Sequence, residues 1–247
     1  MKNILPAIEK LFGVYRWHPK IALRYLPIVD EIKKQKLPNT SIIEFGSAGL
    51  GIAPYIKKRV VGLDVTFSPP FIDTLIPVQA SALAVPFADN SFSVAISLDM
   101  LEHIIPKDRE QAISEMVRVA KNLVCIGVPI GKLSEAQDEA LKKAYQKKHQ
   151  QTFAYLEEQV EYGLPTIENI TQALTTAAQK QHKRIQIAIQ PNINLRLRWF
   201  LMQGWMSKNI LANIIFRKVM LLFIPLFRQI NQEPVYRQLF IVTIKPL

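Results

Sequence analysis

The chain has 247 residues, of which 49% are hydrophobic and 21% charged, and its formal net charge at pH 7 is +11. This composition excludes a disordered chain, and the length is enough to bury one full α/β core in a single domain spanning residues 1–247. The single cysteine, Cys125, excludes an internal disulfide, and the scattered histidines have no Cys or His partner at ligand spacing, so no metal site is expected.

Residues 1–36 are expected to form N-terminal helices ahead of the first strand. They contain Lys2, but Pro6 and Glu9 follow within a few residues, so the apolar core of a signal peptide is missing. We therefore expect a cytoplasmic protein, or one that is peripheral to a membrane.

The next motif is a short apolar run that leads into a glycine-rich turn, with the sequence SIIEFGSAGLG over residues 41–51. No lysine follows Gly51, which excludes a phosphate-binding P-loop, and Ala48 stands where the dinucleotide fingerprint needs its second glycine. Glu44 lies two positions before the first glycine. A carboxylate there suits a ligand with a positive charge and no phosphates, such as S-adenosylmethionine.

Two further apolar runs also end in acids. The run over residues 60–64 ends in Asp64, twenty residues after Glu44, at the place where α/β nucleotide folds put the group that binds a ribose diol. The run over residues 94–98 is followed by Asp99. A single acid at such a place is often a helix cap or a turn residue, but three of them would lie along the edge where open α/β sheets bind ligands.

From about Leu37 to Gly131 the chain resembles the class I S-adenosylmethionine-dependent methyltransferases. The resemblance rests on Glu44-Phe-Gly46, on Asp64, on the segment AVPFADNSFSVAISLDMLEH over residues 84–103, and on the segments 118–121 and 126–131, in that order. It implies that residues 37–131 form a cofactor-binding core and that the cofactor is S-adenosylmethionine. The implied cofactor-binding residues are Glu44, Phe45, Gly46, Ser47, Ala48, Gly49, Asp64, Val65, Ser81, Ala82, Leu83 and Leu98.

The resemblance also implies a role for several of these residues. The backbone of Gly46 and Ser47 would approach the methionine part of the cofactor, and Glu44 would organise the loop on its ammonium side. Asp64 would accept both ribose hydroxyls, and Leu83 with the segment before it would flank the adenine. The chain departs from the family pattern at Ala48, where many members have glycine, and at Ser81, where many have aspartate.

The predicted fold is α/β. We expect a Rossmann-like, seven-stranded and mostly parallel sheet with an antiparallel last strand, helices on both faces and a helical insertion between the last two strands. The residue pattern locates strands at 41–45, 60–64, 94–98, 123–128, 183–190 and 236–246. Before the fifth strand, Asp108 and Gln111 are a predicted capping pair for a helix.

Residues 132–182 are a predicted helical lid. A polar helix is expected from Ser134 to about Glu161, opened by a capping pair of Ser134 and Gln137, and a second, amphipathic helix is expected from Pro165-Thr166 onward.

Residues 192–232 form the predicted insertion, which is basic and apolar. Between Glu168 and Glu233 there are nine lysines and arginines and no acids. Asn209, Asn213 and Arg217 recur every four residues, which predicts a helix with one narrow polar edge. The insertion is predicted to be either a cap over the substrate cleft or an interfacial helix pair on an anionic membrane surface. A nucleic-acid surface is disfavoured because the basic residues alternate with aliphatic ones.

The predicted function is S-adenosylmethionine-dependent methyl transfer, in line, to a small-molecule or lipid-like acceptor. Asp99 and His103 are the predicted catalytic residues, and Tyr162 and His149 are further candidates from the lid. A structural role for His103, as a cap or packing residue at its turn, stays open. The alternative function is a non-catalytic S-adenosylmethionine-binding protein that is peripheral to the membrane.

Overall fold

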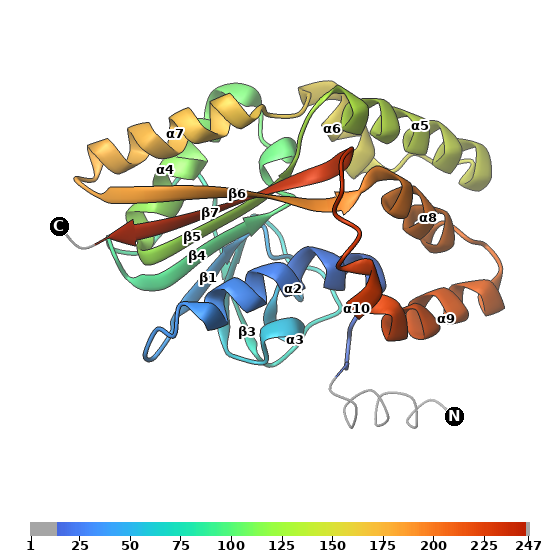
Figure 1. Ribbon diagram of the computed structural model, residues 1–247, viewed down its shortest axis with the longest axis horizontal. Helices are drawn as coiled ribbons and strands as arrows, with labels where there is room; N and C mark the ends of the chain where they lie inside the picture. Colours follow the sequence, from blue (N-terminus) through green and yellow to red (C-terminus); the bar gives the residue numbers. More distant parts are fainter. Residues whose placement is uncertain (1–13, 246–247) are drawn as a thin grey trace.

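The computed structural model describes residues 14–245, and these form a seven-stranded sheet with the order β3-β2-β1-β4-β5-β7-β6 (Figure 1). The strands are β1 (Ile42–Phe45), β2 (Val60–Asp64), β3 (Leu75–Gln79), β4 (Phe92–Leu98), β5 (Ala120–Pro129), β6 (Arg184–Asn194) and β7 (Val235–Lys245). Neighbours from β3 to β5 are parallel, whereas β7 is antiparallel to both β5 and β6. The predicted fold class is confirmed, and the carboxyl ends of β1, β2 and β4 meet at one edge.

Helices cover both faces of this sheet (Figure 1). One face packs against α2 (Pro19–Lys34), α3 (Ala53–Ile56) and α8 (Leu195–Trp205), with Ile28, Tyr55 and Leu201 in the shared core. The other face packs against α4 (Arg109–Val119) and α7 (Ile167–Lys180), with Met116 and Leu174 in a second core. Because β1, β4 and β5 are covered on both sides, they read as continuous apolar runs in the sequence.

The strand that the residue pattern did not locate is β3. It lies at the edge of the sheet, and only Leu75 among its five residues is fully buried. Pro77 interrupts its sequence, which is tolerated because an edge strand has no partner on its outer side. Neither a buried apolar run nor a regular alternation marks it.

Two predicted helix caps are wrong because tertiary partners take the side chains. The side chain of Asp108 does not cap α4, and the Gln111 amide donates instead to the backbone carbonyl of Leu83, at 3.1 Å. In α5 (Lys132–His149), Ser134 is fully buried within the helix, and its hydroxyl donates to the carbonyl of Tyr236, at 3.1 Å.

The lid contains more helices than predicted. The polar stretch is broken at Gln150, whose φ of +56° ends α5, and α6 (Ala154–Tyr162) follows. The start of α7 is confirmed, since the hydroxyl of Thr166 accepts a hydrogen bond from the backbone N–H of Asn169, at 3.1 Å.

The insertion begins where β6 ends at Asn194, four residues later than the strand pattern indicates. It consists of α8, α9 (Ile210–Lys218), the 3₁₀ turn η3 (Val219–Phe223) and α10 (Ile224–Phe227) before the chain enters β7. Between residues 14 and 245, no helix combines the length and the apolar character that a bilayer span requires.

Candidate functional site

The glycine-rich loop is held from inside by Glu44, which lies at the end of β1 and is fully buried. One carboxylate oxygen accepts the hydroxyl of Tyr25 at 2.6 Å, and the other accepts the backbone N–H of Ile52 at 2.6 Å. A Cβ at position 51 would lie 2.1 Å from Oε2 of Glu44, so only Gly51 fits. Burial raises the pKa of Glu44 to about 7, against the opposing hydrogen bonds from Tyr25 and Ile52. Glu44 therefore holds the loop against α2 and the residues that follow the loop.

Three loop residues adopt left-handed backbone conformations: Gly46 (φ +73°), Ala48 (φ +47°) and Gly51 (φ +49°). Gly49 is needed for another reason, since a Cβ there would lie 2.4 Å from the carbonyl oxygens of Ser68 and Pro70. Ala48 thus adopts a left-handed conformation that glycine favours. Because alanine has a Cβ, this conformation destabilises the folded state by about 1 kcal/mol.

Replacing Ala48 with glycine is expected to raise the free energy of unfolding by about 1 kcal/mol, because it relieves the left-handed strain. Urea denaturation measures the change. The matched control is Ala88→Gly, because Ala88 is also an exposed loop alanine but has an ordinary backbone conformation. That variant should lose stability, by about 0.5 kcal/mol. A loss of stability in both variants would contradict the strain at position 48.

The loop is tied to the second strand end by Asp64. Its Oδ2 accepts the backbone N–H of Ala48 at 2.8 Å, and its Oδ1 accepts the backbone N–H of Thr66 at 3.3 Å. Gly62, two residues earlier in β2, leaves room for Ser47, whose Oγ lies 2.4 Å from where a Cβ at position 62 would be. The carboxylate is only partly buried and keeps free lone pairs, so it can accept further hydroxyl donors.

The segment after β3 lies beside Asp64, since the N–H of Ala80 donates to the backbone carbonyl of Asp64 at 3.0 Å. The hydroxyl of Ser81 accepts the N–H of Leu83 at 3.1 Å, so it shapes its own turn and keeps its proton available as a donor. Ala82 and Leu83 are partly buried.

The other predicted cofactor-binding residues differ in how exposed their side chains are. Phe45 and Leu98 point their side chains into the core, with 0% and 2% exposure, so only their backbone can meet a ligand. Val65, which follows Asp64, is 64% exposed. Met100 lies over the loop, because a Cβ at Gly46 would be 2.7 Å from its Cγ.

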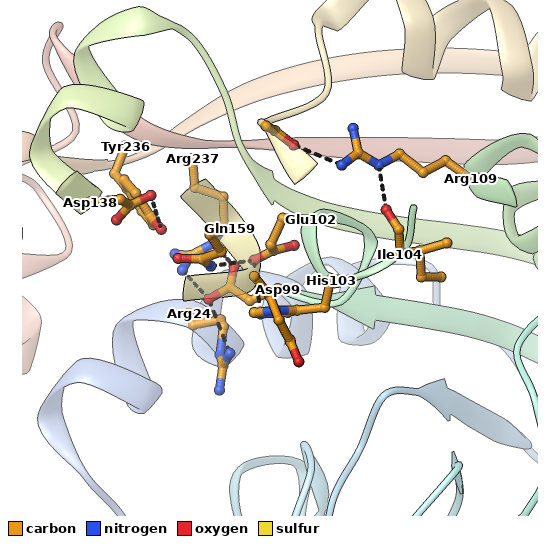
Figure 2. A network of polar contacts seen from close by, with 12 residues as sticks. Arg24, Asp99, Glu102, His103, Ile104, Arg109, Asp138, Gln159, Tyr236 and Arg237 are labelled. Atoms are coloured by element: carbon orange, nitrogen blue, oxygen red, sulfur yellow. Dashed lines mark hydrogen bonds and ion pairs between the residues drawn. The ribbon is translucent and has the colours of Figure 1, made fainter. Parts of the chain in front are cut away.

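Asp99, directly after β4, is the centre of a buried polar network (Figure 2). Arg237 of β7 donates to both of its oxygens at 2.5 Å, and Arg24 of α2 donates to Oδ2 at 3.0 Å. Asn192 of β6 accepts from Arg237 at 2.8 Å. Burial alone would raise the pKa of Asp99, but the charges of Arg237 and then Arg24 outweigh it and hold the pKa below its usual range. This carboxylate is a weak proton acceptor.

His103 lies in the same region and is hydrogen-bonded through Nδ1 to Glu158 of α6, at 3.0 Å (Figure 2). Burial lowers the pKa of His103 and outweighs the opposing charge of Glu158. The imidazole is therefore neutral at neutral pH, and a neutral imidazole can accept a proton.

Glu102, next to His103, is fully buried. Gln159 donates to its Oε1 at 3.2 Å, while Oε2 has no hydrogen-bond partner within residues 14–245. Burial, and then the charge of Asp99, raise the pKa of Glu102 to about 8.

The two lid candidates occupy other places. Nε2 of His149 is hydrogen-bonded to the carbonyl of Met206 at 3.0 Å, and its ring stacks on Tyr145 with centroids 4.5 Å apart. Tyr162 accepts a hydrogen bond from Arg109 through its backbone carbonyl. The structure gives neither side chain a contact with Asp99 or His103.

Sequence reasoning missed Tyr25, Arg24, Asn192 and Arg237. Their partners are far away in the sequence, since Arg237 lies 138 residues from Asp99. Arg24 and Tyr25 belong to a helix whose apolar spacing says nothing about the partners of its polar residues. No local motif marks any of these residues.

Comparison with known proteins found one matching family model. The family model described as "Methyltransferase domain" matches residues 44–123, which run from Glu44 into β5. No curated protein sequence matches the chain.

Solved structures share the fold at low sequence identity. A methyltransferase of Thermotoga maritima, described as a possible histamine N-methyltransferase, is 15% identical with a TM-score of 0.51, over 100% of each chain. The methyltransferase domain of the bacterial protein CtHen1-C is 12% identical with a TM-score of 0.51, over 92% of this chain and 100% of that one. The family model thus identifies a methyltransferase domain over residues 44–123, and these solved structures share the fold of the chain.

Proposed function

We propose that the protein transfers a methyl group from S-adenosylmethionine to a small-molecule or lipid-like acceptor. This proposal rests on the position of three strand ends along one edge of the sheet. The loop organised by Glu44, the carboxylate of Asp64 and the Asp99–Met100 turn lie at the ends of β1, β2 and β4, where open α/β sheets bind ligands.

The residues present fit the cofactor. Gly46 and Ser47 offer backbone groups to its methionine part, and Asp64 keeps lone pairs for two ribose hydroxyls. The turn from Ser81 to Leu83 lies beside Asp64, and the Ser81 hydroxyl can donate to an adenine ring nitrogen. Phe45, Ala48, Gly49, Val65 and Leu98 complete the proposed binding set through their backbone or their position.

When bound, S-adenosylmethionine supplies a methyl group that is already activated on a sulfonium. The protein has to align the acceptor with that methyl group and exclude water. We assign the alignment to Asp99, which Arg24 and Arg237 hold in place, because its low pKa makes it unsuited to take a proton. For a hydroxyl acceptor, the neutral imidazole of His103 is the group that takes the proton.

A cofactor-binding protein without catalysis is the second candidate function. The observation that favours it is that both oxygens of Asp99 are engaged by arginines, so that this residue can be structural alone. A location at the membrane surface belongs to either function and depends on the insertion.

Transfer of a labelled methyl group separates the two functions. Purified protein is incubated with methyl-labelled S-adenosylmethionine and an extract of its own cell, and the products are partitioned between organic solvent and water. Label in the organic phase identifies a lipid-like acceptor, and label in the water phase identifies a polar one. Cofactor binding without label in either phase would overturn catalysis in favour of the second function.

A further inference from the structure

An apolar stripe runs along the outer side of the insertion. Five side chains recur at steps of four, four, three and four residues, which is the spacing of one helix face. They are Leu211 (67% exposed), Ile215 (45%), Val219 (40%), Leu222 (78%) and Leu226 (55%), and they follow one another through α9, η3 and α10. We use the name outer stripe for these five residues.

The inner side of the same segment is already packed. Phe216 and Ile224 are buried in the core shared with α2 and α8, at 5% and 4% exposure. A Cβ at Gly204 of α8 would lie 2.3 Å from the ring of Phe216, so α8 and α9 are in close contact. The segment is therefore held to the protein by its inner side, and the outer stripe is a second apolar face.

The predicted polar edge of this helix is narrow and partly solvated. Asn209 is exposed and caps α9 by accepting the N–H of Ala212 at 3.0 Å, Asn213 is partly buried, and Arg217 is exposed. An outward face of a surface helix is normally polar, and a contiguous exposed apolar patch marks an interaction site.

The charge around the outer stripe indicates what it binds. Arg196, Lys208 and Arg217 are exposed on α8, on the connection to α9 and on α9 itself. No acid occurs between Glu168 and Glu233 to balance them. Two copies of such a surface would repel each other, whereas a surface of negative charge over an apolar layer would satisfy both the cations and the stripe.

We infer that the outer stripe docks the protein on an anionic lipid bilayer. The segment lies in the plane of the interface, with the stripe at the boundary between headgroups and acyl chains and the basic residues among the phosphates. In the ribbon diagram α9 and α10 lie next to each other, below α8 (Figure 1).

The docked surface is joined to the acceptor side by α8. Arg198 of α8 is paired with Asp138 of α5 at 2.5 Å and lies over the ring of Tyr236, 3.4 Å from its centroid. Tyr236 is the neighbour of Arg237 in β7. A lipid-like acceptor would therefore reach the polar network around Asp99 from the docked end. This route rests on the proposed function, whereas docking on the bilayer does not.

Vesicle flotation tests the inference with the full chain. Wild-type protein is expected to float with vesicles of phosphatidylcholine and phosphatidylglycerol, to stay unbound with phosphatidylcholine alone, and to be released by salt. The double variant Leu222→Ser/Leu226→Ser should partition at least about tenfold more weakly. Arg217→Gln should weaken binding by a smaller factor and reduce its dependence on salt.

The matched control is Leu133→Ser on α5, because Leu133 is 62% exposed but lies outside the outer stripe. It should float like the wild type, and far-UV circular dichroism checks that every variant is folded. Docking would be overturned by a wild type that stays unbound with both vesicles, by equal flotation with both, or by unchanged partition of the double variant. A dimer that requires Leu222 would assign the stripe to a second copy instead. The labelled-methyl assay is independent of flotation, so either proposal can fail alone.

Discussion

Replacing Asp64 with alanine is expected to weaken S-adenosylmethionine binding about 100-fold, as measured by isothermal titration calorimetry. The physical reason is the loss of two charge-assisted hydrogen bonds to the ribose hydroxyls, each contributing roughly 1.5 kcal/mol. The variant also removes the acceptor for the N–H groups of Ala48 and Thr66, which shapes the loop. Both effects act in the same direction.

Two further variants separate these effects. Asp64→Asn keeps one carbonyl oxygen for the N–H of Ala48 but loses the charge, and about a tenfold loss of affinity is expected. Asp73→Ala removes an exposed carboxylate just ahead of β3 and should leave the affinity unchanged. Wild-type affinity in Asp64→Ala would show that this carboxylate does not bind the ribose.

Replacing Glu102 with glutamine is expected to stabilise the protein at high pH and to have little effect at low pH. Burial and then the charge of Asp99 raise the pKa of Glu102 to about 8, whereas a carboxyl in the unfolded chain titrates near its ordinary value of about 4.3. Between these two values the folded state holds a proton that the unfolded state releases. Because only the folded state binds this proton in that range, the free energy of unfolding of the wild type falls as the pH rises from about 4.3 to about 8.

Glutamine does not titrate, so the difference between variant and wild type isolates this carboxyl. We expect similar free energies of unfolding near pH 5 and a gain for Glu102→Gln on the order of 3 kcal/mol near pH 9, measured by urea denaturation at both values. The other shifted groups, including Glu44, are common to both proteins and cancel. The control is Glu110→Gln, at an exposed position of α4, which should follow the wild-type pH profile. A difference that stays constant from pH 5 to pH 9 would show that Glu102 is charged in the folded protein throughout.

The sequence was sufficient for the buried parallel strands β1, β2, β4 and β5 and for the acids at the ends of β1, β2 and β4. Strands such as β1 and β4 are buried on both faces, and this leaves continuous apolar runs with an acid at the end. These features depend on residues within about twenty positions of one another.

The partners of Asp99 could not be predicted because they lie far from it in the sequence. Arg24, Asp99 and Arg237 come from α2, the end of β4 and β7, and only the completed sheet brings them together. The same reason explains the wrong cap at Ser134. Its hydroxyl has a local partner in principle, but the carbonyl of Tyr236, about a hundred residues later, takes it.

In the insertion, the spacing of polar residues does not predict which apolar residues are buried. The spacing of polar residues predicts a narrow polar edge and an apolar remainder, but it does not say how much of the remainder is covered. In the structure Phe216 is buried while Leu211 and Ile215, on the same helix, are exposed. Only tertiary packing distinguishes these two apolar faces.

The position of β7 has a consequence for the order in which the protein is completed on the ribosome. Among the seven strands of residues 14–245 it is the last to be synthesised, yet it lies between β5 and β6. Until residues 235–245 have emerged, the long apolar strand β5 has an open edge, which is where nascent chains pair with one another. The same residues bring Arg237 to Asp99. The glycine-rich loop can thus assemble early in synthesis, while Asp99 gains Arg237 only after β7 has emerged.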